Sequence, residues 1–79
     1  MYSFEVGKTY GSMDYSIPHI KILQRTQKTC MVINENGTSW RMMIRSDGFS
    51  EYLTDSSVPK RWRECYTYYA KFADEEVDF

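Results

Sequence analysis

Short runs of β-branched and aromatic residues alternate along the chain with clusters of glycine, asparagine, aspartate and serine. Runs of this length between turn-forming residues are typical of β-strands joined by tight turns. The pattern predicts four or five strands within roughly fifty residues. They cover residues 8–15, 19–26, 28–34, 38–45 and 49–53.

Two predicted turns indicate how these strands are connected. Asn36-Gly37 lies between the third and fourth runs, and Asp47-Gly48 lies between the fourth and fifth. Such pairs favour tight hairpins, because asparagine and glycine tolerate the left-handed backbone that these turns need. Strands that follow one another through tight turns form a meander, and this spacing is typical of a small all-β barrel.

The segment after residue 54 has two interpretations. Asp55-Ser56-Ser57 could cap a helix with Pro59 near its first turn, whereas the run Tyr66–Tyr69 is a cluster of strong strand formers. We expect a short helical turn at about residues 58–63, followed by a closing strand at about residues 65–72. The helical alternative would place five side chains on one stripe: Val58, Trp62, Cys65, Tyr66 and Tyr69.

The length and the charge distribution predict one domain with an acidic tail. Seventy-nine residues are too few to supply two hydrophobic cores. We expect a mainly β barrel over residues 1–73 and a tail over residues 74–79. The tail holds four of the eleven acidic residues, so the barrel carries ten bases against seven acids. Such a tail is either solvated or competes with an acidic partner for a basic surface.

Several short motifs resemble a known group of proteins. Arg25-Thr26-Gln27-Lys28 links the second and third predicted strands, Val6-Gly7-Lys8-Thr9-Tyr10 precedes it, and Arg41, Ile44, Asp47-Gly48 and Glu51-Tyr52 follow it. Together they resemble small uncharacterised bacterial and mobile-element proteins that share an Arg-Thr-x-Lys step between strands. The resemblance covers residues 4–53 and implies a small SH3-like barrel of five or six antiparallel strands. It implies no common activity and transfers no functional residue.

The Arg-Thr-x-Lys step also has a physical interpretation. It joins two strands, so it must reverse the chain, and Thr26 is expected to hydrogen-bond nearby backbone to hold the turn. Arg25 and Lys28 would then flank the turn in solvent. We interpret the motif as a folding signal rather than as a ligand contact.

No pattern in the sequence indicates catalysis, a metal site or a cofactor. His19 is the single histidine, and neither Cys30 nor Cys65 belongs to a closely spaced pair, so the usual zinc spacings are missing. Gly7-Lys8-Thr9 matches the end of a phosphate-binding loop, but Tyr2 stands where the first glycine of that loop would be. We expect a non-enzymatic protein with two free thiols.

The fourth predicted strand has two faces of different character, because successive side chains of a strand point to opposite sides. Three apolar residues share the expected core face: Trp40, Met42 and Ile44. Two cations and a methionine share the other: Arg41, Met43 and Arg45. A two-residue turn would place Cys30 and Val32 beside this second face, whereas a three-residue loop with Gly37 in the left-handed region would place Met31 and Ile33 there.

Either register gives the Arg41 side of the strand apolar neighbours, so we expect it to be covered. The C-terminal segment, with Trp62, Tyr66 and Tyr69, is the first candidate to cover it. The alternative is an exposed patch of arginine, methionine and aromatic residues, a composition that the centres of protein interfaces favour.

A second candidate surface is the run Lys60-Arg61-Trp62-Arg63. Its three bases could hold phosphates while the indole stacks on a base. The isoelectric point of about 5.7 argues against a dedicated nucleic-acid binder, and Trp62 could instead anchor the terminal segment.

These observations favour an interaction module that binds another protein through Arg41, Met43, Arg45 and Trp62. A barrel that binds nucleic acid through Lys60, Arg61, Trp62 and Arg63 is the alternative. The resemblance adds an accessory or inhibitor role in a phage or mobile element. We expect a cytoplasmic protein, because the start of the chain lacks the features of a signal peptide and the longest apolar run, Cys30 to Ile33, is too short to span a membrane.

Overall fold

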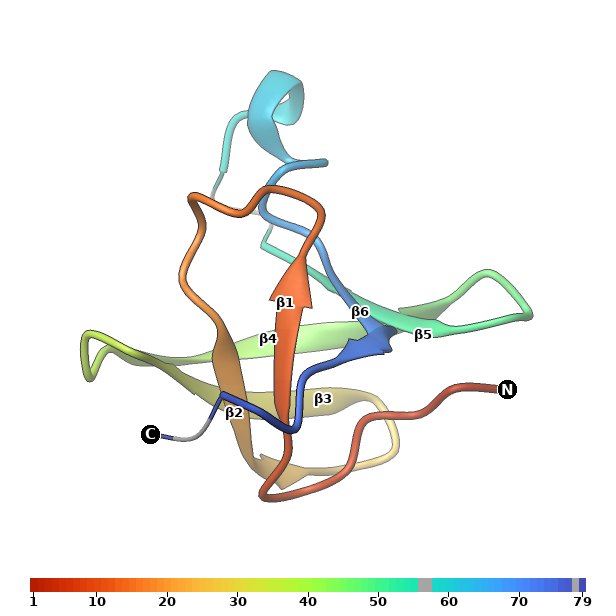
Figure 1. Ribbon diagram of the computed structural model, residues 1–79. Helices are drawn as coiled ribbons and strands as arrows, with labels where there is room; N and C mark the ends of the chain where they lie inside the picture. The colour runs from red at the N-terminus through yellow and green to blue at the C-terminus, as the bar shows by residue number, and fades with distance from the viewer. Residues whose placement is uncertain (56–57, 78) are drawn as a thin grey trace.

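Six antiparallel strands pair in the order in which they occur along the chain, and β6 pairs with β1 to close a barrel (Figure 1). The computed structural model describes residues 1–55, 58–77 and 79. The strands are β1 Thr9–Ser12, β2 Ile20–Arg25, β3 Thr29–Asn34, β4 Ser39–Ser46, β5 Glu51–Thr54 and β6 Tyr68–Ala73. The predicted SH3-like barrel is therefore confirmed, with all five predicted strands and the closing strand present.

The expected helical turn is also confirmed. It is the short 3-10 helix η1, Lys60–Trp62, in the connection between β5 and β6. In Figure 1 this connection projects beyond the end of the barrel. The longer helix of the alternative interpretation is wrong for the described residues, since Tyr68 and Tyr69 lie in β6. Ser56 and Ser57, which that alternative used as a cap, lie outside the described residues.

The core consists of the inward side chains of the strands, together with Phe4 from the N-terminal segment. The ring of Phe4 meets that of Tyr10 edge-on, with 4.8 Å between the centroids. On β4, Met42 is buried while Trp40 and Ile44 are half-buried against the core, which confirms the predicted core face. The other buried apolar residues are Ile20, Ile22, Cys30, Val32, Leu53, Tyr68 and Ala70.

The hairpin between β3 and β4 has the three-residue loop. The amide of Asn34 donates to the carbonyl of Thr38 at 2.9 Å, and Gly37 has a φ of +86°, the left-handed conformation that favours glycine. Met31 is consequently opposite Arg41. The alternative with a two-residue turn is wrong, and the side chains of Met31 and Arg41 share the outer surface.

A β-bulge interrupts β2 near Leu23. The pairing with β3 shifts register between Ile22 and Gln24, which leaves an extra residue on β2. Strict alternation would have turned Gln24 towards the core, but both Leu23 and Gln24 are exposed. The bulge therefore turns Gln24 to the outer surface of the barrel, where alternation after the buried Ile22 already places Leu23.

The Arg-Thr-x-Lys step forms the turn between β2 and β3. The hydroxyl of Thr26 accepts hydrogen bonds from the amides of Lys28 and Thr29, at 3.2 and 3.0 Å, as its predicted role requires. The expectation that Arg25 lies in solvent is wrong. Its guanidinium donates to both carboxylate oxygens of Glu51, at 2.8 and 3.1 Å, because the barrel closes and brings β5 next to this turn.

The acidic segment that follows β6 folds back along β1. The amide of Asp74 donates to the carbonyl of Thr9 at 3.0 Å, and the hydroxyl of Thr9 lies within hydrogen-bond distance of the carbonyl of Val77 at 2.7 Å. The imidazole of His19 lies 3.2 Å from the carboxylate of Asp74. Residues 74–77 are thus attached to the barrel, and Asp78 lies outside the described residues.

Within the described parts of the chain there is no helix with the length and apolar character that crossing a bilayer requires.

Candidate functional site

The outer face of β4, formed by Arg41, Met43 and Arg45, is exposed. Each of the three residues is exposed, and 54% of Met43 is accessible. The expectation that the C-terminal segment covers this face is wrong, because η1 projects away from the barrel and Trp62 and Tyr66 are themselves exposed. The side chains keep the alternation that the sequence predicted, but they meet solvent.

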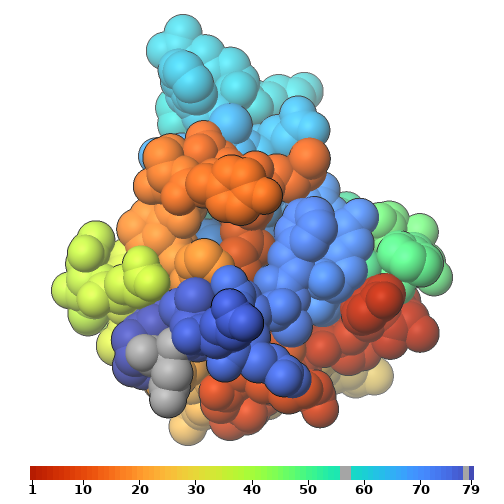
Figure 2. Space-filling view, viewed as in Figure 1, coloured from red at the N-terminus to blue at the C-terminus, as the bar shows by residue number. Residues whose placement is uncertain are grey.

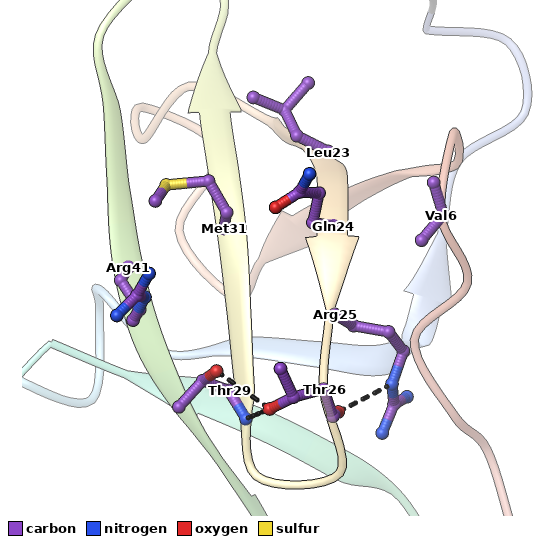
Figure 3. Close-up of a pocket in the computed structure, with 8 residues that line it drawn as sticks. All are labelled: Val6, Leu23, Gln24, Arg25, Thr26, Thr29, Met31 and Arg41. Carbon is purple, nitrogen blue, oxygen red and sulfur yellow. Dashed lines mark hydrogen bonds between the residues drawn. The ribbon is translucent and has the colours of Figure 1, made fainter.

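A shallow depression of about 420 Å³ lies beside this face (Figure 3). Arg41 from β4 and Met31 from β3 line one side of it, and Leu23 from β2 lines the other. Their arrangement follows from the local structure, because the hairpin register aligns Met31 with Arg41 and alternation with the buried Ile22 directs Leu23 outward. The remaining lining residues are Val6, Gln24, Arg25, Thr26 and Thr29.

The arginines around the depression differ in their electrostatic surroundings. The guanidinium of Arg25 holds the pKa of Glu51 below its usual value, mainly through their hydrogen bonds, and Glu51 in turn raises the pKa of Arg25. Neither Arg41 nor Arg45 forms an ion pair with any residue that the structure describes. The β4 outer face therefore presents two positive charges that no described residue neutralises in an ion pair.

The second predicted surface is only partly available. Trp62 is 52% exposed, and the guanidinium of Arg61 lies 5.8 Å from the centre of its ring. Arg63, however, is half-buried and donates to the carbonyl of Val58 at 3.2 Å. The η1 surface that remains for a ligand consists of Lys60, Arg61 and Trp62.

The two predicted surfaces are separate in the fold. Trp62 lines a depression of its own with Val58, Pro59 and Tyr66, and none of these residues lines the depression beside Arg41. The four residues predicted to bind protein therefore divide, with three on β4 and Trp62 on η1.

The two cysteines and the single histidine differ in burial and in their neighbours. Both cysteines are free, as predicted, with Cys30 buried and Cys65 half-buried. Burial raises the pKa of the Cys30 thiol to about 11, so it stays protonated and unreactive near neutral pH. His19 is paired with Asp74. Among the described residues, no group of three or more His, Cys, Asp or Glu side chains could hold a metal ion.

Sequence reasoning did not include Leu23 or Val6 in the binding surface. Alternation along β2 places Leu23 on the outer side with Lys21, and the pairing of Ile22 with Val32 brings it near Met31. An apolar side chain at an outward position of a strand is a signal that could have found it. Val6 precedes the first strand, and 59% of it is accessible. Its position beside β2 follows from the path of the N-terminal segment, for which the sequence gives no periodic pattern.

No protein-family model matches the chain, and no curated protein or solved structure matches it. What these surfaces can bind is inferred from their own side chains. The β4 outer face offers two exposed cations around a methionine, whereas the η1 surface offers an exposed indole with two cations.

Proposed function

We propose that this chain is a non-enzymatic module that binds another protein through the outer face of β4 and the adjoining depression. The observation that carries the proposal is the row of Arg41, Met43 and Arg45, exposed on a strand and without an ion-pair partner among the described residues. Arginine and methionine are enriched at the centres of protein interfaces. Solvated cations also steer an oppositely charged partner to the surface.

The geometry favours a partner segment that combines acidic and apolar side chains. Carboxylates would pair with Arg41 and Arg45, and an apolar side chain would enter the depression between Leu23 and Met31. Because β4 pairs with β3 on one side and with β5 on the other, most of these side chains stand on fixed backbone. Binding then requires little ordering of the barrel, which favours affinity.

An accessory or inhibitor role in a phage or mobile element belongs to the same proposal. It rests on the resemblance carried by residues 4–53 and adds no contact residue.

The test is a comparison of affinity captures from the native host, read by quantitative mass spectrometry. The baits are the unaltered protein, the double variant Arg41→Ala/Arg45→Ala, and the control Lys60→Ala/Arg61→Ala. Both variants remove two positive charges, so they differ only in the surface that changes. We expect the β4 variant to lose a specific protein that the control retains. Equal capture by all three baits would contradict the proposal.

A second function, nucleic-acid binding at η1, is supported by the exposure of Trp62 beside Arg61. An indole flanked by cations can stack on an unpaired base while the cations contact phosphates. Titration of the protein with single- and double-stranded oligonucleotides at low salt, followed by Trp fluorescence, tests this function. Quenching that Lys60→Ala/Arg61→Ala abolishes would support it, and unchanged fluorescence would exclude it.

A further inference from the structure

A row of side chains crosses three neighbouring strands on the outside of the barrel. Arg45 of β4 is opposite Tyr52 of β5, and Tyr52 is opposite Tyr69 of β6. Directly opposite residues lie on the same face of a sheet. The centres of the two tyrosine rings are 5.7 Å apart, and the ring planes are inclined by 36°. An exposed cation and two half-buried rings therefore lie side by side.

The row continues along β6 with a third ring and a second cation. Phe72 meets Tyr69 edge-on, with 5.6 Å between the ring centres. The ammonium of Lys71 lies 5.0 Å from the centre of the Tyr69 ring and 5.4 Å from that of Phe72. We call Tyr52, Tyr69 and Phe72 the aromatic platform. Arg45 lies at its β4 end, and the ammonium of Lys71 lies over the rings of Tyr69 and Phe72.

Further aromatic surface adjoins the Lys71 end. Phe49, in the turn between β4 and β5, is 59% exposed, and its ring centre lies 5.9 Å from the ammonium of Lys71. The ring of Tyr2 meets that of Phe49 edge-on at 5.4 Å. In Figure 2 the N-terminal segment, this turn and β6 lie side by side on the face that is shown. The aromatic surface thus extends beyond the strands.

Two acidic residues, Asp47 and Glu64, lie near the platform. Asp47 lies near Lys71, but its carboxylate accepts hydrogen bonds from the amides of Phe49 and Ser50, at 2.9 and 2.8 Å, within its own turn. Glu64 lies near Tyr69; burial, with this charge, raises the pKa of the Tyr69 phenol, which stays neutral at physiological pH. Arg45 forms no ion pair with a described residue.

We propose that the aromatic platform binds single-stranded nucleic acid. Unpaired bases would stack on Tyr52 and Tyr69, and the phosphates on either side would contact Arg45 and Lys71. Aromatic side chains on the open face of a sheet recognise unpaired bases in this way, and such stacking tolerates any sequence because every base has a flat π face.

The proposal is separate from binding at the β4 outer face and at η1. It shares Arg45 with the first surface and nothing with the second, so the decisive variants are those of the tyrosines. Because stacking requires exposed base faces, the platform should prefer a single strand to a duplex of the same sequence.

The experiment measures fluorescence anisotropy of labelled oligo-dT, oligo-U and a DNA duplex at low salt. The variants are Tyr52→Leu and Tyr69→Leu, with Tyr15→Leu as the matched control, because Tyr15 is fully exposed in the β1–β2 loop. We expect each platform variant to weaken single-strand binding about tenfold or more and the control to leave it unchanged. Stronger binding of oligo-dT or of oligo-U would identify the DNA or the RNA form as the ligand.

Tyr52→Phe and Tyr69→Phe keep the stacking surface and remove only the hydroxyl, so these variants should bind as the unaltered protein does. If a leucine variant unfolds, Lys71→Ala, at an exposed position, should weaken single-strand binding, and unchanged binding by that variant would overturn the proposal. The proposal is overturned if no oligonucleotide binds, or if the duplex binds as tightly as the single strands. It is also overturned if the phenylalanine variants lose binding, or if only Lys60→Ala/Arg61→Ala reduces it, which would assign the binding to η1.

Discussion

Arg25 and Arg41 border the same depression, yet their surroundings differ. The guanidinium of Arg25 donates to both oxygens of Glu51 and to the carbonyl of Phe4, so it links β2, β5 and the N-terminal segment. Arg41 stands on β4, exposed and without an ion-pair partner among the residues described. The same residue type therefore serves the fold at one end of the depression and is available for recognition at the other.

The difference arises from the strands on which the two arginines stand. Arg25 ends β2 where the closure of the barrel brings Glu51 close, and the half-buried carboxylate also accepts the amide of Phe4 at 2.8 Å. Arg41 lies in the middle of the β3–β4 hairpin, where its neighbour across the strands is Met31. A charged residue in a sequence thus indicates a binding surface only once it is known that no other residue of the protein pairs with it.

Replacing Arg25 tests the structural half of this comparison and has the largest expected effect. Arg25→Ala removes the partner of a carboxylate that is mostly buried and should lower the free energy of unfolding by about 2 kcal/mol. Urea denaturation followed by Trp fluorescence measures the change. Arg41→Ala is the matched control, and equal losses for the two variants would contradict the division of roles.

A substitution at Gly37 tests the surroundings of Arg41, because the conformation of Gly37 fixes the β3–β4 register that places Met31 beside Arg41. Gly37→Ala places a Cβ at a φ of +86° and should destabilise the protein by about 1 kcal/mol. Glu35→Ala, an exposed position in the same loop, serves as the control in thermal unfolding. A variant as stable as the control would show that another loop conformation is accessible.

Lowering the pH should reduce the stability that the Arg25–Glu51 ion pair contributes, and this effect should be smaller than that of Gly37→Ala. The pKa of Glu51 is lowered in the folded state by Arg25, so its contribution to stability is fully present above the unfolded value near 4.5. That contribution is lost as the pH falls through the lower folded value. Unfolding curves measured below about pH 5 should therefore show a steeper loss for the unaltered protein than for Glu51→Gln. Parallel pH profiles would contradict this assignment.

The smallest effect on stability is expected for the β4 outer face itself. Arg41→Ala/Arg45→Ala should change the free energy of unfolding by less than about 0.5 kcal/mol, because exposed side chains without partners contribute little to the fold. Urea denaturation alongside Arg25→Ala provides the comparison. A loss close to that of Arg25→Ala would mean that these arginines also have a structural role.

The periodic parts of the sequence predicted most of the fold. Alternation assigned the core face of β4, with Met42 buried, and the asparagine–glycine and aspartate–glycine turns located the hairpins. The exposure of Arg41 could not be predicted, because it depends on the position of the connection between β5 and β6. A tyrosine-rich segment is compatible both with a layer that covers the sheet and with a loop that projects from it. The ion pair of Arg25 and Glu51 joins residues 26 positions apart, which short-range patterns do not reveal.

The β2 bulge illustrates a second limit of pattern analysis. An extra residue in one strand changes which side chains face outward from that point on, and nothing in the composition around Leu23 indicates that Gln24 also faces outward. The hairpin loop length was left open between two registers for a similar reason, since Asn36-Gly37 suits both. The candidate site was thus predicted on β4 but not on β2.

Closure of the barrel has a consequence for how binding specificity can change over time. Each strand of the closed barrel already pairs with a neighbour on both sides. A partner therefore cannot readily add a strand to the sheet, and recognition depends on the outward side chains. Arg41, Met43 and Arg45 can then be exchanged one at a time while the interior stays intact. A lineage could therefore retarget this protein without having to rebuild it.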